Sequence, residues 1–156
     1  MSALPETSSR EGIGVREDEA MAADPTTHLV TTMPFCGTLK MRARSLDAAQ
    51  VELEIDWADE LCTSNGLLHG GVLMALADSA GGACAAANLP TESIGTSTIE
   101  SKTNFLGAVR SGMVRAVARP LHVGSTTIVV ETEMRDDRDR LVAKVTQTQV
   151  VLRPKT

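Results

Sequence analysis

Aromatic side chains are almost missing from this sequence: its 156 residues include two Phe, one Trp and no Tyr. A surface that binds single-stranded nucleic acid stacks bases on aromatic rings, so this scarcity argues against that class of protein. It also predicts that any pocket is mainly aliphatic. The formal net charge of −5 argues further against a general affinity for nucleic acid, because such domains usually carry a basic surface.

Cysteine is scarce as well. Cys36, Cys62 and Cys84 are odd in number and contain no close-spaced pair, which supports neither a disulfide framework nor a zinc ribbon, so no metal site is expected. The N-terminus has no apolar segment typical of a secretory signal, and no apolar run approaches the length of a membrane span once Gly, Asp and Asn are counted. We therefore expect a cytoplasmic protein without membrane or nucleic-acid partners. A phosphate-binding loop and a dinucleotide fingerprint are also missing.

The composition is that of an ordinary globular domain, with 42% hydrophobic and 22% charged residues. A chain of this length is expected to form one domain with a substantial core. Residues 1–26 are polar and rich in charge, and they are predicted to form a flexible tail. The folded domain is then predicted to span residues 27–156.

The central feature is a run of small and apolar residues at positions 67–88. Residues 71–87 are predicted to form one long helix because they are rich in Ala and Leu. An apolar stripe recurs at helical spacing. Its members are Leu73, Ala77, Ala80 and Cys84, widened by Met74, Gly81 and Ala85. Gly81 and Gly82 each cost a helix interior about 1 kcal/mol relative to Ala, so we expect another element or a ligand to approach this helix closely.

Alternating apolar and polar residues predict strands on both sides of this helix. Two precede it, at residues 37–46 and 51–55, and residues 28–35 form a short mixed segment before them. Four follow it, at residues 94–106, 113–121, 126–134 and 141–152. Short turns join these four, so they are expected to be antiparallel, and the charged turn at 135–140 is expected to be solvated. One helix against an antiparallel sheet gives the α+β class.

His69, Gly70 and Gly71 stand where the predicted helix begins. The first amides of a helix have no acceptor within it, and they lie at the positive end of its dipole. Glycine allows a substrate carbonyl to come close to them, so they are suited to form an oxyanion hole for acyl transfer. The alternative is that the two glycines only ease a tight helix entry.

Asp78 is the one charged residue of the predicted helix. It follows Gly70 by eight positions, so the two lie about 12 Å apart along the axis at ~1.5 Å per residue. One carbonyl carbon cannot contact both groups of the same helix. If both serve one reaction, two helices must lie antiparallel in a two-fold dimer with shared sites. The alternative is a carboxylate on a solvated face.

Two other sites would use the same residues. Cys62, His69 and Asp78 could form a triad with a cysteine nucleophile, but no local signature supports it. Cys62 and His69 lack the further ligands that a structural metal requires. Neither site is favoured.

Two segments resemble the hotdog-fold acyl-CoA thioesterases: residues 65–80 (NGLLHGGVLMALADSA) and residues 120–131 (PLHVGSTTIVVE). The nearest branch is that of the 4-hydroxybenzoyl-CoA and phenylacetate-pathway enzymes. The resemblance covers residues 37–154. It implies the hotdog fold, a curved antiparallel sheet wrapped around one long central helix, with two preceding and four following strands here. It also implies hydrolysis of an acyl-CoA thioester to a free acid and coenzyme A.

The resemblance implies roles for individual residues near the helix. Asp78 matches the catalytic carboxylate of the family, as nucleophile or as general base for water. Gly70 matches the oxyanion donor, with Gly71 beside it. His69 matches the motif histidine that helps to position the thioester carbonyl. Thr63 stands six positions before His69, where relatives often carry Asn or Gln.

Coenzyme A enters as part of the substrate, and the resemblance implies no separate cofactor. Ser125 and Thr126 match positions that contact its nucleotide end, and Arg153 matches a basic position near its phosphates. Many relatives carry an Arg-Pro pair where this chain has Gly and Ala at 107 and 108, and Arg110 is a candidate to supply the missing arginine. The implied assembly is a homodimer, with two dimers forming a tetramer.

Two other functions stay open at this point. One is a non-catalytic dimer that binds or senses acyl-CoA, in which Asp78 would have no task. The other is a hydratase or dehydratase of the same fold, which needs a catalytic His soon after the Asp, and no His follows Asp78 in the predicted helix. Coenzyme A binding measured together with thiol release separates these functions.

Overall fold

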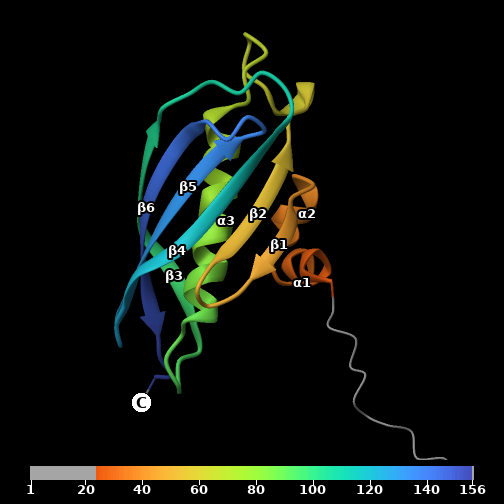
Figure 1. The fold of residues 1–156 in the computed structure, drawn as a ribbon. Helices are drawn as coiled ribbons and strands as arrows, with labels where there is room; N and C mark the ends of the chain where they lie inside the picture. The colour runs from red at the N-terminus through yellow and green to blue at the C-terminus, as the bar shows by residue number, and fades with distance from the viewer. Residues whose placement is uncertain (1–23, 156) are drawn as a thin grey trace, which may run out of the picture.

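A computed structural model of the chain describes residues 24–155, and Figure 1 shows a six-stranded sheet curved around one long helix. The elements are α1 (Pro25–Thr32), α2 (Pro34–Thr38), β1 (Arg42–Leu46), β2 (Val51–Asp56), a short 3-10 helix (Asp59–Leu61), α3 (Gly70–Ala87), β3 (Gly95–Phe105), β4 (Met113–Val123), β5 (Thr127–Asp136) and β6 (Leu141–Leu152). Most of the predicted tail, residues 1–26, lies outside the described residues, and its last two positions belong to α1.

The strand order is β1-β2-β4-β5-β6-β3, and every neighbouring pair is antiparallel. β3 therefore leaves the helix, crosses to the far side of the sheet and pairs with β6 rather than with β4, which follows it in the chain. β1 and β3 form the two edges. This arrangement confirms the predicted α+β class, and it places α3 on the concave face of the sheet (Figure 1).

Helix α3 confirms the predicted central helix and extends it by one residue at the start. The predicted stripe is buried at six positions, which are Leu73, Ala77, Ala80, Gly81, Cys84 and Ala85. Met74 is the exception, because its side chain lies on the face turned away from the sheet and is 45% exposed. Asp78 lies one turn further along that same open face, which is where residues four apart in a helix meet.

The predicted strand at 37–46 is wrong in its first half, and the segment at 28–35 is helical. Pro25 and Pro34 both occupy the first turn of a helix, where the missing N–H of proline is no loss. The chain then reverses at Lys40, which has a φ of 56°, before β1 begins. Two short helices thus replace the extended segment that alternation predicted.

Helix α1 covers one edge of the sheet. The hydroxyl of Thr26 accepts from the backbone N–H of Ala43 at 3.1 Å and contacts its carbonyl oxygen at 3.4 Å. This contact blocks the outer edge of β1 at that residue. The opposite edge strand, β3, pairs only with β6 among residues 24–155, so within this part of the chain its outer edge is open.

The charged turn between β5 and β6 is not simply solvated, as the sequence predicted, because Asp136 is buried. Its carboxylate accepts hydrogen bonds from the backbone amides of Arg138 (3.1 Å) and Arg140 (2.9 Å) and from Nε of Arg140 (2.8 Å). Burial opposes ionisation, but the bonds from Arg140 and Arg138 outweigh it, so the pKa of Asp136 lies below its ordinary value of 3.8.

The lowered pKa of Asp136 predicts a pH-dependent contribution to stability. Because the folded pKa lies below 3.8, ionised Asp136 stabilises the fold above that pH, and this contribution disappears as the pH falls through the folded value. We expect Asp136→Asn to lower the Tm by several degrees at neutral pH and much less at strongly acidic pH. Thermal unfolding across pH measures this, with the exposed neighbour Asp137→Asn as control. An equal loss at all pH values would contradict the expectation.

Candidate active site

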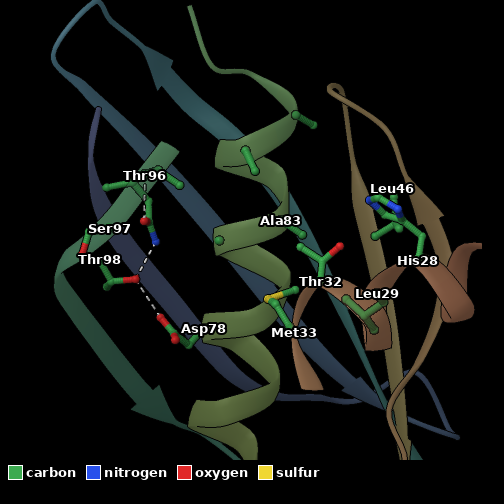
Figure 2. Close-up of a pocket in the computed structure, with 14 residues that line it drawn as sticks. His28, Leu29, Thr32, Met33, Leu46, Asp78, Ala83, Thr96, Ser97 and Thr98 are labelled. Carbon is green, nitrogen blue, oxygen red and sulfur yellow. Dashed lines mark hydrogen bonds between the residues drawn. The ribbon is translucent and has the colours of Figure 1, made fainter. Parts of the chain in front are cut away.

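Asp78 is held by side chains of the sheet, although it lies on the open face of α3. Its Oδ1 accepts hydrogen bonds from the hydroxyl of Thr98 on β3, at 3.0 Å, and from Nε2 of Gln147 on β6. Figure 2 shows the carboxylate pointing from the helix toward β3. Asp78 itself is exposed. The helix therefore presents a fixed carboxylate to the outside, which differs from a freely solvated side chain.

The hydrogen bonds continue along β3 and β6. Nε2 of Gln149 donates to the hydroxyl of Thr98 at 2.7 Å, and Oε1 of Gln149 accepts from the hydroxyl of Thr96 at 3.1 Å. Nε2 of Gln147 also reaches Thr98, at 3.1 Å. Both glutamines are buried. These five residues form one connected polar network that ends at the carboxylate.

A cavity of about 610 Å³ opens beside Asp78. It runs along the open face of α3, between α1 on one side and β3 on the other (Figure 2). Gly82 and Ala83 of α3 form its floor, and His28 and Thr32 of α1 line the far wall. Because the floor consists of small residues, the cavity has room for a ligand close to the helix backbone, and Asp78 lies at its edge.

The two interior glycines of α3 have different reasons to be there. A Cβ on Gly81 would overlap Oε1 of Gln147 and lie 2.9 Å from its Cδ, whereas a Cβ on Gly82 would meet nothing within 4 Å. Gly81 thus makes room for a protein side chain, and Gly82 opens the cavity. The predicted close approach to the helix is confirmed at Gly81.

Within the part of the chain that the structure describes, one amide in the first turn of α3 makes no hydrogen bond. His69 is the N-cap, and its Nδ1 accepts from the amide of Gly71 at 2.8 Å. Its carbonyl oxygen accepts from the amides of Val72 and Leu73. The amide of Gly70 has no acceptor among the described residues. It is therefore the first-turn donor that remains for a ligand.

The bond between the Gly71 amide and the His69 imidazole indicates which ring nitrogen of His69 carries the hydrogen. A bond from the Gly71 amide requires an unprotonated Nδ1, so Nε2 carries the ring hydrogen in the neutral side chain. His69 is exposed. Its ring can therefore offer a hydrogen-bond donor at the same helix terminus as the Gly70 amide.

Thr63 lies in the loop that leads into α3. Its amide donates to the carbonyl oxygen of Leu67 at 2.7 Å, and its carbonyl oxygen accepts from the amide of Gly66 at 3.1 Å. Its hydroxyl accepts from the amide of Asn65 at 3.5 Å. Within residues 24–155, no hydrogen bond joins its side chain to His69 or Gly70. The single chain thus keeps Thr63 within its own loop.

Cys62 does not join the other two members of the alternative triad. Its thiol donates to the carbonyl oxygen of Ala58 at 3.2 Å. Burial raises the pKa of the Cys62 thiol, and the carboxylates of Asp59 and Glu60 raise it further. The thiol form is therefore favoured over the thiolate that nucleophilic attack requires.

Three of the four residues implied for coenzyme A lie together at one end of the sheet. Nη2 of Arg153 donates to the carbonyl oxygen of Ser125 at 3.0 Å. The carbonyl oxygen of Thr126 accepts from the amide of Val151 on β6 at 2.8 Å. Arg110 lies at the opposite end of β4, whose 11 residues extend roughly 35 Å at ~3.3 Å per residue. It lines a second hollow of about 400 Å³ beside the β5–β6 turn.

Sequence reasoning missed the polar network on the sheet. The signal was present in the last strand, where Gln147 and Gln149 lie between Val145 and Val151 in the row of residues on the buried face. Two glutamines on a core-facing row need hydrogen-bond partners, because a buried amide without them destabilises the fold. The sequence does not show that the partner is Asp78, since the two residues lie 69 positions apart.

Comparison with known proteins bears on this site directly. A sequence profile described as the thioesterase superfamily matches residues 65–143, which include the start of α3, Asp78 and the turn at Ser125. The chain belongs to this superfamily. The predicted hotdog fold is confirmed with it.

Relatives of this thioesterase-superfamily chain carry the names of esterases and hydrolases. A Saccharolobus solfataricus protein that carries the provisional name of an esterase is 33% identical over 117 residues, which are 75% of this chain and 82% of the relative. The 1,4-dihydroxy-2-naphthoyl-CoA hydrolase of Escherichia coli is 37% identical over 91 residues, which are 56% of this chain and 63% of the relative.

Solved structures show the same fold. The thioesterase PA1618 of Pseudomonas aeruginosa, solved as a Q49A variant, has a TM-score of 0.76 at 26% identity, with 81% of this chain and 93% of that chain covered. The Rv1847/MT1895 protein of Mycobacterium tuberculosis, also provisionally named an esterase, has a TM-score of 0.75 at 28% identity, with coverage of 79% and 99%.

Proposed function

We propose that this protein hydrolyses acyl-CoA thioesters to a free acid and coenzyme A. The observation that carries the proposal is Asp78, a carboxylate fixed by two hydrogen bonds at the edge of a cavity lined by small residues. As a nucleophile, Asp78 would attack the thioester carbonyl, expel the coenzyme A thiolate and form an anhydride that water then opens. As a general base, it would take a proton from a water that attacks the same carbon.

The amide of Gly70 is proposed to stabilise the oxyanion of the tetrahedral intermediate. One such donor contributes about 3–4 kcal/mol in acyl-transfer enzymes. Gly70 and Asp78 of one chain lie about 12 Å apart along α3, at ~1.5 Å per residue, so they cannot serve the same carbonyl. We therefore propose that two chains form a two-fold dimer, and that each site combines Asp78 of one chain with Gly70 of the other.

The open edge of the sheet supports this dimer. The outer edge of β1 is blocked at Ala43 by Thr26, whereas β3 offers an unpaired strand edge beside Asp78. Ile99 and Phe105 of β3 are 62% and 53% exposed, and Met74 of α3 is 45% exposed. A partner that covers β3 and the open face of α3 would bury these apolar side chains, which lie near the proposed site.

Shared sites predict complementation between two inactive variants. Asp78→Asn removes the carboxylate, and Gly70→Pro removes the amide of N1, where the backbone of a helix accepts proline. A Cβ at Gly70 would lie 3.1 Å from Cζ of Phe105, so this exposed ring must shift slightly in the variant. In a hybrid dimer one site keeps both native groups, so an equal mixture of reassembled chains should recover about a quarter of wild-type activity. No recovery, together with activity in a monomer, would contradict the shared site.

The position of Arg110 agrees with a shared site. It lies at the opposite end of the sheet from Ser125, Thr126 and Arg153 in one chain. In a dimer with antiparallel α3 helices, Arg110 of one chain would be carried toward the end where Ser125 of the other chain lies. We propose that the nucleotide end of coenzyme A is held by Ser125, Thr126 and Arg153, with Arg110 supplied by the partner.

A panel of short, long and aromatic acyl-CoA thioesters tests the activity itself, with release of the thiol as the readout. Turnover of at least one thioester is expected. Tight coenzyme A binding without thiol release from any member would instead support the acyl-CoA-binding dimer. The branch of 4-hydroxybenzoyl-CoA and phenylacetate-pathway enzymes, the pairing of dimers into a tetramer and the cytoplasmic location stay predictions.

A further inference from the structure

We propose that Gln147 is a positioning residue that fixes the orientation of the Asp78 carboxylate, so that Oδ2 is the reacting oxygen. This inference rests on the proposed hydrolysis. Both protein donors, Gln147 and Thr98, bond to Oδ1 of Asp78. Among the residues that the structure describes, Oδ2 receives no hydrogen bond. It is therefore the oxygen left to attack a carbonyl or to accept a proton from water.

The direction of the bond from Thr98 is determined by its neighbours. A hydroxyl has one hydrogen and two acceptor lone pairs. Both lone pairs of Thr98 are used, because Nε2 of Gln147 and Nε2 of Gln149 donate to it at 3.1 and 2.7 Å. Its single hydrogen is then available for Asp78, at 3.0 Å. The two glutamines thus make Thr98 a permanent donor to the carboxylate.

The fold tolerates two destabilising features to keep Gln147 in place. Gln147 is fully buried, and its Oε1 has no hydrogen-bond partner in the part of the chain that the structure covers. A buried acceptor without a partner is unfavourable, so an apolar side chain of the same length would suit this position better. Gly81 in turn weakens α3, and a Cβ there would overlap Gln147. Stability alone does not explain either residue.

Both features are explained by the bond to Asp78. Gln147 lies on β6 in the core, and its amide reaches the helix only because Gly81 has no side chain. An amide donor holds a carboxylate without introducing a charge of its own. The position therefore favours a glutamine, which orients the charged group, over a residue that packs better.

Gln147→Met tests this role because it keeps the length of the side chain and removes the donor. We expect kcat to fall roughly 10- to 100-fold, as misplacing a reacting group does, with KM little changed and the Tm equal or higher. Thr98→Val should reproduce the loss of kcat, and Thr98→Ser should restore it because the hydroxyl returns. Thr132→Val is the matched control, since the buried hydroxyl of Thr132 has no hydrogen-bond partner among the described residues and is not one of the donors to Asp78.

The possible outcomes separate this inference from the proposed function. If Asp78→Asn is inactive while Gln147→Met and Thr98→Val keep kcat within about twofold of wild type, the positioning role is wrong and the hydrolysis stands. If Gln147→Met does not fold, the comparison of Thr98→Val with Thr98→Ser tests the positioning role, because Thr98 is exposed and its substitution does not disturb the core. If Asp78→Asn keeps full turnover, the proposed function and the positioning role both fail.

A second readout does not depend on turnover. The side-chain amide signals of Gln147 in a ¹⁵N-labelled sample report its hydrogen bonds directly. Asp78→Ala removes the acceptor, so these signals are expected to shift strongly, while Asp47→Ala on the exposed turn between β1 and β2 should leave them unchanged. Signals that do not move in Asp78→Ala would overturn the contact and the positioning role with it.

Discussion

Asp78→Asn is expected to lower kcat for acyl-CoA hydrolysis about a thousandfold or more, with the Tm within a few degrees of wild type. The amide has the same shape as the carboxylate, and its oxygen can still accept from Thr98 and Gln147, so the network that holds it is kept. It is neither a nucleophile nor a base at neutral pH. Removing the central group of a catalytic unit typically costs this much in rate.

Initial rates of thiol release over a range of acyl-CoA concentrations measure this effect. The control is Asp47→Asn, because Asp47 is exposed in the turn between β1 and β2 and its carboxylate does not hydrogen-bond to Thr98 or Gln147. Circular dichroism and thermal unfolding show whether each variant is folded. Wild-type turnover by a folded Asp78→Asn protein would remove the basis of the proposed mechanism.

Alanine at Gly81 and at Gly82 is expected to change stability in opposite directions, although the two residues are neighbours in α3. Gly82→Ala should stabilise the fold by up to about 1 kcal/mol, because helix propensity improves and the new Cβ meets nothing within 4 Å. Gly81→Ala should destabilise it by about 1–3 kcal/mol, because the new Cβ overlaps the buried amide of Gln147.

The same pair of variants differs in activity. Gly81→Ala pushes Gln147 away from Asp78, so its kcat is expected to fall. Gly82→Ala only adds a methyl group to the cavity floor, so its kcat is expected to change less. Urea unfolding and initial rates measured on the same samples check both effects. A loss of stability in both variants would contradict the expectation for Gly82, and it would indicate that a partner's side chains fill the space beside it.

The sequence predicted the parts of the site that lie close together in the chain. Helix α3 and the position of Asp78 within it follow from composition and from a spacing of 3.6 residues per turn. The helix terminus at Gly70 follows from the glycines beside His69. Eight helical residues set a fixed distance between the carboxylate and the amide, so the sequence alone also predicts that two chains share a site.

The alternation of apolar and polar residues predicted the wrong structure where other local signals, such as proline, oppose it. Residues 37–46 alternate like a strand, but the structure makes the first part of that segment helix α2 and a turn. Pro34 starts this helix, and Lys40 ends it with a positive φ. The turn at 135–140 looked like a solvated charge run, yet Asp136 is buried because backbone amides and Arg140 satisfy its carboxylate.

The sequence by itself determined the helix, its carboxylate and its free first amide, because each depends on residues within a few turns of one another. Only the tertiary structure decided that β3 pairs with β6, and thereby that Thr98 and Gln147 meet at Asp78. Strand order is set by which edges can be covered and how the core fills, and contacts between residues 20 and 69 positions apart follow from that order. The role of Gly81 is decided the same way, since a glycine shows that space is needed but not which side chain fills it.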